Sequence, residues 1–91
     1  MTKEVAIQAV DMALYGLEKF ADLRGISVGR LFPRYREINQ ELTDWEFGVD
    51  TPDGVIEPQY DILVNDWLED IANIKWMVEA IVAQREALMN R

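Results

Sequence analysis

The sequence predicts a small all-α protein, and three observations carry that prediction. Apolar residues recur at helical spacing in three long stretches of the chain. Segments containing Pro and Gly separate these stretches. Of the 91 residues, 49% are hydrophobic, and three Trp, three Tyr and three Phe supply bulk for one modest core. We therefore expect a single α-helical domain over residues 1–91. It would be a bundle of three main helices with a long C-terminal helix and a short irregular or hairpin excursion at about 47–59.

The first helix is expected to begin after Thr2 and to run to about Leu23. A Thr side chain can cap a helix, and Glu4 in the first turn suits the positive end of the helix dipole. Gly16 costs about 1 kcal/mol relative to Ala inside a helix. We explain it by close approach of the C-terminal helix, with the two helices antiparallel. The main apolar stripe of this first helix comprises Ile7, Val10, Leu14, Leu17 and Ala21, and a line of small residues beside it comprises Ala6, Ala9, Ala13 and Gly16.

The middle of the chain is predicted to hold a turn and a second main helix. Gly25 fits a left-handed helix terminus, and Ser27 is a favourable cap for a short turn over Val28 to Phe32. Pro33 suits the first turn of a helix that runs to about Trp45. The apolar positions of that helix are Tyr35, Ile38, Leu42 and Trp45.

The segment from Phe47 to Gln59 is predicted to be non-helical. Its centre, Asp50 to Gly54, contains Pro and Gly and is typical of a turn. The flanking residues 47–49 and 55–56 would either pair as a small β-hairpin or pack beneath the helices.

The stretch from Tyr60 to Arg91 contains no Pro or Gly and predicts one helix. Some 30 residues span roughly 45 Å, whereas a compact chain of this length has a radius of gyration of only about 12 Å. We therefore expect a homodimer in which a second copy covers this helix. The main apolar stripe is Val64, Trp67, Ile71, Ile74, Val78, Ile81, Arg85 and Leu88, with Arg85 as the exception, and the other side carries Ala72, Trp76, Ala80, Ala83 and Ala87. The expected dimer contacts are Trp67, Ile71, Ile74, Trp76, Val78 and Ile81.

The composition excludes several kinds of chemistry. The chain has no Cys and no His, which excludes disulfides, thiolate sites and the commonest general base. It shows no targeting segment and no apolar run long enough for a membrane span. We expect a cytoplasmic protein without membrane contact, cofactor, bound metal or enzymatic activity.

The charge is unevenly distributed along the chain. Four of the nine basic residues fall between Arg24 and Arg36, and the stretch from Glu37 to Asp70 contains only acidic charges. With a net charge of −8, we expect a non-enzymatic module that binds a basic protein, as an inhibitor, an adaptor or a mimic of the phosphate backbone of DNA. In size and charge the chain resembles small acidic α-helical phage proteins. Direct binding of nucleic acid is not expected. The candidate partner-binding residues are Glu37, Glu41, Asp44, Glu46, Asp66, Glu69 and Asp70.

One alternative rests on carboxylates that two helices could bring together. The layout of Glu37 and Glu41 on one helix, and of Asp66, Glu69 and Asp70 on another, resembles the all-α nucleotide pyrophosphohydrolases of the MazG type. The resemblance implies Mg²⁺-dependent hydrolysis of nucleoside triphosphates. The chain departs from that family's pattern, because the two glutamates are four rather than three residues apart and Asp66 and Glu69 occur in inverted order.

A second alternative is DNA binding through residues 20–31, which resemble a helix-turn-helix. Ala21, Gly25 and Leu31 occupy its small, turn and core positions, and Arg30 with the arginines that follow would contact phosphates. Pro33 interrupts the would-be recognition helix, and the net charge opposes this reading.

Overall fold

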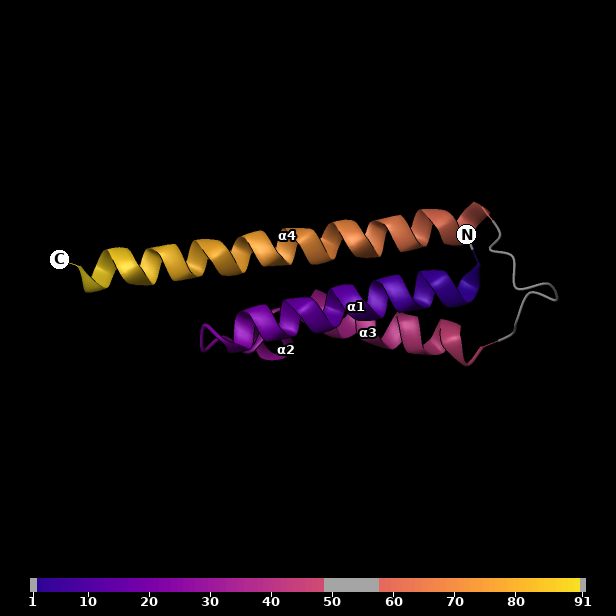
Figure 1. The fold of residues 1–91 in the computed structure, drawn as a ribbon, viewed down its shortest axis with the longest axis horizontal. Helices are drawn as coiled ribbons and strands as arrows, with labels where there is room; N and C mark the ends of the chain where they lie inside the picture. The colour runs from indigo at the N-terminus through magenta and orange to yellow at the C-terminus, as the bar shows by residue number, and fades with distance from the viewer. Residues whose placement is uncertain (1, 49–57, 91) are drawn as a thin grey trace.

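The computed structural model describes residues 2–48 and 58–90 of the chain, and these residues form four helices and no strand. The all-α prediction is therefore confirmed. The molecule measures 59 × 18 × 17 Å along its principal axes (Figure 1). The predicted hairpin near Asp50 to Gly54 lies outside the described residues. The helices are α1 (Lys3–Asp22), α2 (Val28–Leu31), α3 (Pro33–Glu46) and α4 (Pro58–Met89).

Both ends of α1 follow the local rules expected from the sequence. The Thr2 hydroxyl oxygen accepts a hydrogen bond from the backbone N–H of Val5 at 3.3 Å. At the other end Gly25 has a φ of 71°, the left-handed conformation that glycine adopts without strain. The N–H groups of Gly25 and Ile26 donate to the carbonyls of Asp22 and Ala21, at 3.0 and 2.9 Å. This is the Schellman arrangement, and it satisfies the last carbonyls of the helix.

The turn before α3 also depends on local chemistry. Phe32 has extended backbone angles, φ −120° and ψ 99°, as expected for a residue that precedes Pro. Pro33 then begins α3, where its missing N–H costs nothing. Ser27 precedes α2 as predicted, but its side chain makes no capping hydrogen bond.

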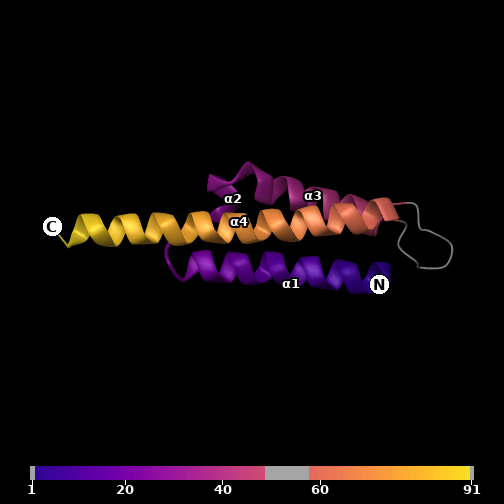
Figure 2. The same cartoon turned by 90° about the horizontal axis from the view of Figure 1, so that it is seen from above.

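The direction of α4 differs from the prediction. α1 and α4 begin at the same end of the molecule and run parallel, whereas α3 runs in the opposite direction (Figures 1 and 2). The contacts agree with this parallel direction. Phe20 of α1 lies beside Lys75 of α4, and further along the chain Arg24, just after α1, lies beside Arg85. The antiparallel packing of these two helices predicted above is wrong. The chain reverses once between α1 and α3 and again between α3 and α4, and two reversals restore the original direction.

One continuous core fills the space between α1, α3 and α4. Each of the three helices contributes most of the stripe predicted from its spacing, and Trp67 is the largest side chain that is fully buried. Ile7 and Trp45 are only half-buried, whereas Ala6 is buried. The last members of the α4 stripe leave the core, because Ile81 is half-buried and Arg85 and Leu88 are exposed. The buried apolar residues are Ala6, Val10, Leu14, Leu17, Ala21, Ile26, Val28, Tyr35, Ile38, Leu42, Val64, Trp67, Ile71, Ile74 and Val78.

Aromatic rings join the three main helices at the end where α1 and α4 begin. Trp45 of α3 stacks on Tyr60 of α4, with ring centroids 5.3 Å apart. It also meets Trp67 at 5.9 Å with an interplanar angle of 55°. The ammonium of Lys3 from α1 lies 5.6 Å from the centroid of the Trp45 ring, a cation–π contact. Trp45 therefore contacts both of the other long helices.

Most of the predicted dimer contacts are buried inside one chain. Trp67, Ile71, Ile74 and Val78 belong to the core of the single chain, where helices other than α4 already cover them. Trp67, Ile74 and Val78 are at most 2% exposed and belong to the core rather than to the surface, whereas Ile71, at 5%, also lines the hollow between α1 and α4. Trp76 is 65% exposed and Ile81 is half-buried, so these two remain accessible. None of the described helices is long and apolar enough to cross a membrane.

The expected close approach at Gly16 is also wrong. No heavy atom lies within 4 Å of the position that a Cβ would take there. Gly16 instead faces an open hollow between α1 and α4. A small residue on a helix permits close packing but does not require it.

Gly16 and Gly25 give a matched pair of substitutions. Gly16→Ala is expected to raise the free energy of unfolding by about 1 kcal/mol, because the methyl group meets no neighbour and Ala favours helix. Gly25→Ala is expected to lower it by about 1–2 kcal/mol, because its φ of 71° strains any residue with a Cβ. Urea unfolding followed by circular dichroism measures both. Equal changes in the two variants would contradict this account.

Candidate functional site

The side chains of α3 and α4 meet around Arg34 near the start of α3. Its Nε donates to Asp70 Oδ2 of α4 at 2.7 Å. Its Nη1 donates to Glu37 and to Glu41 on its own helix, both at 3.3 Å. The hydrogen bond to Asp70 is the main cause that raises the pKa of Arg34 above its ordinary value, and partial burial opposes it. A single guanidinium thus holds three carboxylates.

Glu41 also accepts a hydrogen bond from a side chain in the core. The indole Nε1 of Trp67, whose side chain is 0% exposed, donates to Glu41 Oε2 at 2.7 Å. A buried indole N–H without an acceptor would cost about 1–3 kcal/mol. Glu41 supplies that acceptor and keeps its other oxygen for Arg34.

Five of the seven predicted partner-binding carboxylates lie along the same boundary between α3 and α4. On α3, Glu37, Glu41 and Asp44 are spaced four and three residues apart and therefore share one helical face. On α4, Asp66 and Asp70 are four apart, and Asp70 is the residue that meets Arg34. We call this set the acidic seam: Glu37, Glu41, Asp44, Asp66 and Asp70.

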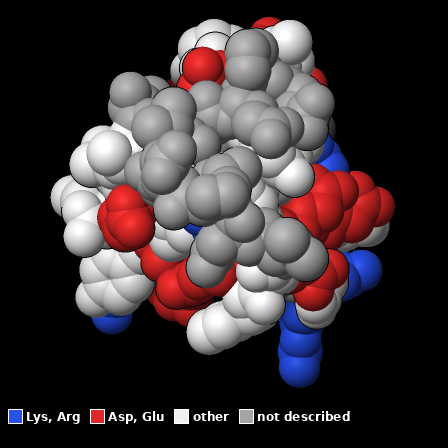
Figure 3. All heavy atoms as spheres, turned by 90° about the vertical axis from the view of Figure 1, so that its right-hand side faces the viewer, with Lys and Arg blue, Asp and Glu red and all other residues white. Residues whose placement is uncertain are grey.

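The other two predicted residues lie elsewhere. Glu46 lines a different hollow, which Lys3, Glu4 and Asp11 of α1 also line. Glu69 is exposed on α4 and points about 100° around the helix from Asp70. Viewed from the end where α1 and α4 begin, carboxylates occupy several separate areas of the surface (Figure 3). The single acidic face predicted from residues 37–70 is thus divided, and only part of it follows the seam.

The sequence analysis placed Arg34 in a basic patch and among the arginines expected to contact phosphates, and it missed the role of Arg34 in the seam. The spacing of Arg34, Glu37 and Glu41, three and seven residues along one helix face, was a usable signal. Its pairing with Asp70 was not readable from spacing, because it depends on how α3 and α4 align.

The geometry bears on the pyrophosphohydrolase alternative. Among residues 2–48 and 58–90, no group of three or more carboxylates is placed to hold a metal ion. The carboxylates that resemble those of the pyrophosphohydrolases, Glu41 and Asp70, are both bonded to Arg34.

The structure also bears on the helix-turn-helix alternative. α2 has only four residues, and a separate helix begins at Pro33. Arg34 is held within the seam, and Arg36 donates to the backbone carbonyl of Gly29. Of the arginines expected to contact phosphates, Arg30 is exposed and remains available.

Comparison with models of protein families, with curated proteins and with solved structures finds no match to this chain.

The Arg34–Asp70 contact predicts a measurable coupling between α3 and α4. Arg34→Met and Asp70→Asn are each expected to lower the free energy of unfolding by about 1 kcal/mol, because the pair is only partly shielded from water. The double variant should cost less than the sum of the two by about 0.5 kcal/mol or more, and the difference should shrink in high salt. Arg30→Met combined with Asp70→Asn is the control and should be additive. A coupling of zero for Arg34 would contradict the structural role given to it.

Tyr35 predicts how stability changes at alkaline pH. Burial raises the pKa of Tyr35 to about 12, and the Glu18 carboxylate, which accepts its hydroxyl hydrogen at 3.2 Å, adds to the rise. A folded-state pKa above the unfolded value of about 10 stabilises the fold fully below pH 10 and progressively less as the pH rises through 12. The loss should approach about 2 kcal/mol relative to Tyr35→Phe, which lacks the titrating group. Parallel curves for the two proteins between pH 9 and pH 12 would refute this assignment.

Proposed function

We propose that this chain is a non-enzymatic protein-binding module, an inhibitor or adaptor, whose acidic seam binds a basic surface of another protein. The observation that supports the proposal is the charge of the seam. Five carboxylates from two helices border it, and the ion pairs described along it involve one guanidinium, that of Arg34. The excess negative charge is held on rigid helices, where it would attract a basic partner over a distance of about one Debye length.

The carboxylates of the seam divide into two groups. Glu41 and Asp70 are committed to Trp67 and Arg34, so they hold the helices together. Asp44 and Asp66 are exposed, and the hydrogen bond found for Asp44 comes from the amide of Gln40 on its own helix. We assign contact with the partner mainly to Asp44 and Asp66. A basic partner of this kind includes proteins that bind nucleic acid, in which case the seam would stand in for backbone phosphates.

We also propose that the chain acts as a homodimer. The radius of gyration is 15.6 Å, against about 12 Å for a compact chain of this length. α4 accounts for the difference, because its last turns extend beyond the other helices (Figure 1).

The test separates binding from folding. Asp44→Lys and Asp66→Lys together should abolish capture of a basic protein from a cell lysate, while the fold remains intact because neither carboxylate supports the Arg34 network. The matched control is Asp11→Lys with Asp22→Lys, which changes the net charge equally at exposed positions of α1, outside both the seam and the hollow between α1 and α4. Binding to a purified captured protein should weaken steeply with added salt. Equal capture by the two variants would rule the seam out.

A further inference from the structure

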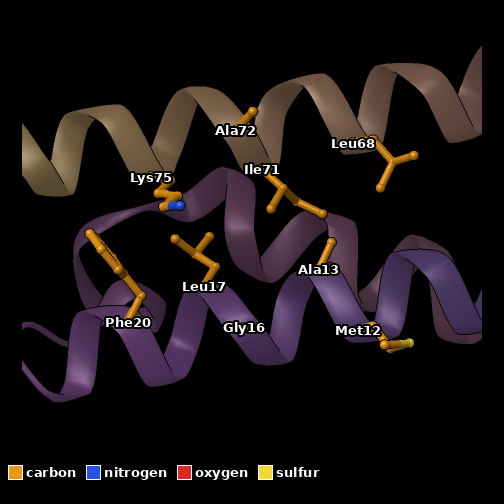
Figure 4. A pocket seen from close by; sticks show the side chains of 9 residues that line it. All are labelled: Met12, Ala13, Gly16, Leu17, Phe20, Leu68, Ile71, Ala72 and Lys75. Carbon is orange, nitrogen blue, oxygen red and sulfur yellow. The ribbon is translucent and has the colours of Figure 1, made fainter.

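An apolar groove runs between α1 and α4, and the acidic seam plays no part in it. It has a volume of about 380 Å³, and its lining is mostly apolar. Figure 4 shows α1 and α4 on either side of this groove, with the side chains that line it. The lining residues are Met12, Ala13, Gly16, Leu17, Phe20, Leu68, Ile71, Ala72 and Lys75.

The groove is open because small residues line its centre. Gly16 and Ala72 carry no bulk that could fill it, and nothing lies within 4 Å of a Cβ at Gly16. At its edge Met12 is 74% exposed. The ammonium of Lys75 lies 5.2 Å from the centroid of the Phe20 ring and closes one end. The result is a shallow apolar channel with a cation at its rim.

The chain also carries an uncovered helical segment that matches this groove in character. The residues of α4 from Ala83 onward are all exposed as far as Asn90. Leu68, Lys75, Val82 and Met89 recur every seven residues, so the face that lines the groove continues onto this free end. Val82 is half-buried and Met89 is 83% exposed.

We propose that the groove is occupied by the free end of α4 from a second copy of this chain, with the two α4 helices antiparallel. The exchange is reciprocal, because a two-fold axis places each free end in the groove of the other copy. Aligning the middle of the free end with the middle of the groove places the axis beside Glu79. Lys75 then faces Val82 of the second copy.

Charge complementarity supports this register. Glu79 lies three residues before Val82 and Glu86 lies four residues after it, so all three share one face of α4. In the antiparallel pair they flank Lys75 of the other copy on both sides. The same two contacts recur across the two-fold axis. The two Glu79 side chains also meet beside the axis, and a Lys75 lies within about one turn of each to offset their charge.

The exposed area is also of the size that a dimer requires. The chain exposes 6318 Å², whereas a compact monomer of this mass would expose about 5400 Å². The chain is elongated, and the free end of α4 contributes to its exposed surface (Figure 1). A standard interface buries approximately 800 Å² on each partner.

The dimer leaves the acidic seam accessible. Asp70 of the seam and Lys75 of the groove lie about 140° apart around α4, since each residue advances the helix by about 100°. A dimer therefore carries two outward seams. Loss of dimerisation and loss of partner binding are separable failures, because they involve different residues.

Sedimentation of charge variants tests the proposal. The intact chain, at about 100 µM, should sediment at about twice 10.5 kDa. Lys75→Glu should sediment as a monomer, because it opposes Glu79 and Glu86 with a like charge. Adding Glu79→Lys and Glu86→Lys to that variant should restore the dimer. Val82→Glu with Met89→Glu should also give a monomer, whereas Ile62→Glu, at a position that is 65% exposed at the start of α4, should not.

A cysteine cross-link tests the direction of the two helices. The chain contains no Cys, so a single introduced thiol reports one contact. Glu79→Cys should form a disulfide dimer on oxidation, because it lies beside the two-fold axis, and Asn65→Cys should not. A monomeric intact chain would overturn the proposal. So would a Lys75→Glu variant that remains dimeric, or a cross-link at position 65 in preference to position 79.

Discussion

The buried indole of Trp67 is the constraint around which the rest of the molecule is arranged. A fully buried ring strengthens the core, but its N–H then needs an acceptor, and Glu41 provides it at 2.7 Å. The same carboxylate lies 3.3 Å from Nη1 of Arg34, which also holds Asp70 of α4. Part of what resembles a surface charge pattern is therefore a consequence of burying one tryptophan.

Local structure followed from the sequence because its causes are local. The Thr2 cap, the left-handed Gly25 and the Pro33 start of α3 each depend on a few neighbouring residues. The apolar stripes also held, since helical spacing determines which residues share a face. The fully buried stripe of α4 ended early, at Val78, because α1 ends and α3 begins near that level of α4. The lengths of these two helices are independent of the pattern in α4.

The direction and alignment of the helices relative to one another were harder to predict from the sequence. A line of small residues is compatible with close or distant packing and with either direction, so Gly16 gave no basis for choosing the orientation of α4. Counting charges along the chain treated Glu37, Glu41 and Asp70 alike as surface charges. The alignment of α3 with α4 decides which of them meets Arg34, and that alignment is set by the core as a whole. The same limitation assigned Trp67 and Ile74 to contacts with a second subunit, whereas the chain's own helices bury them.

The parallel course of α1 and α4 has an electrical consequence for the whole molecule. Peptide dipoles in these two helices point the same way, and only the shorter α3 opposes them. A single chain therefore carries a net moment along its 59 Å axis. It should align in an applied electric field, and transient birefringence would record that alignment. An antiparallel pair related by a two-fold axis perpendicular to α4 has no axial moment, so association would be visible as a loss of orientation as well as a gain of mass.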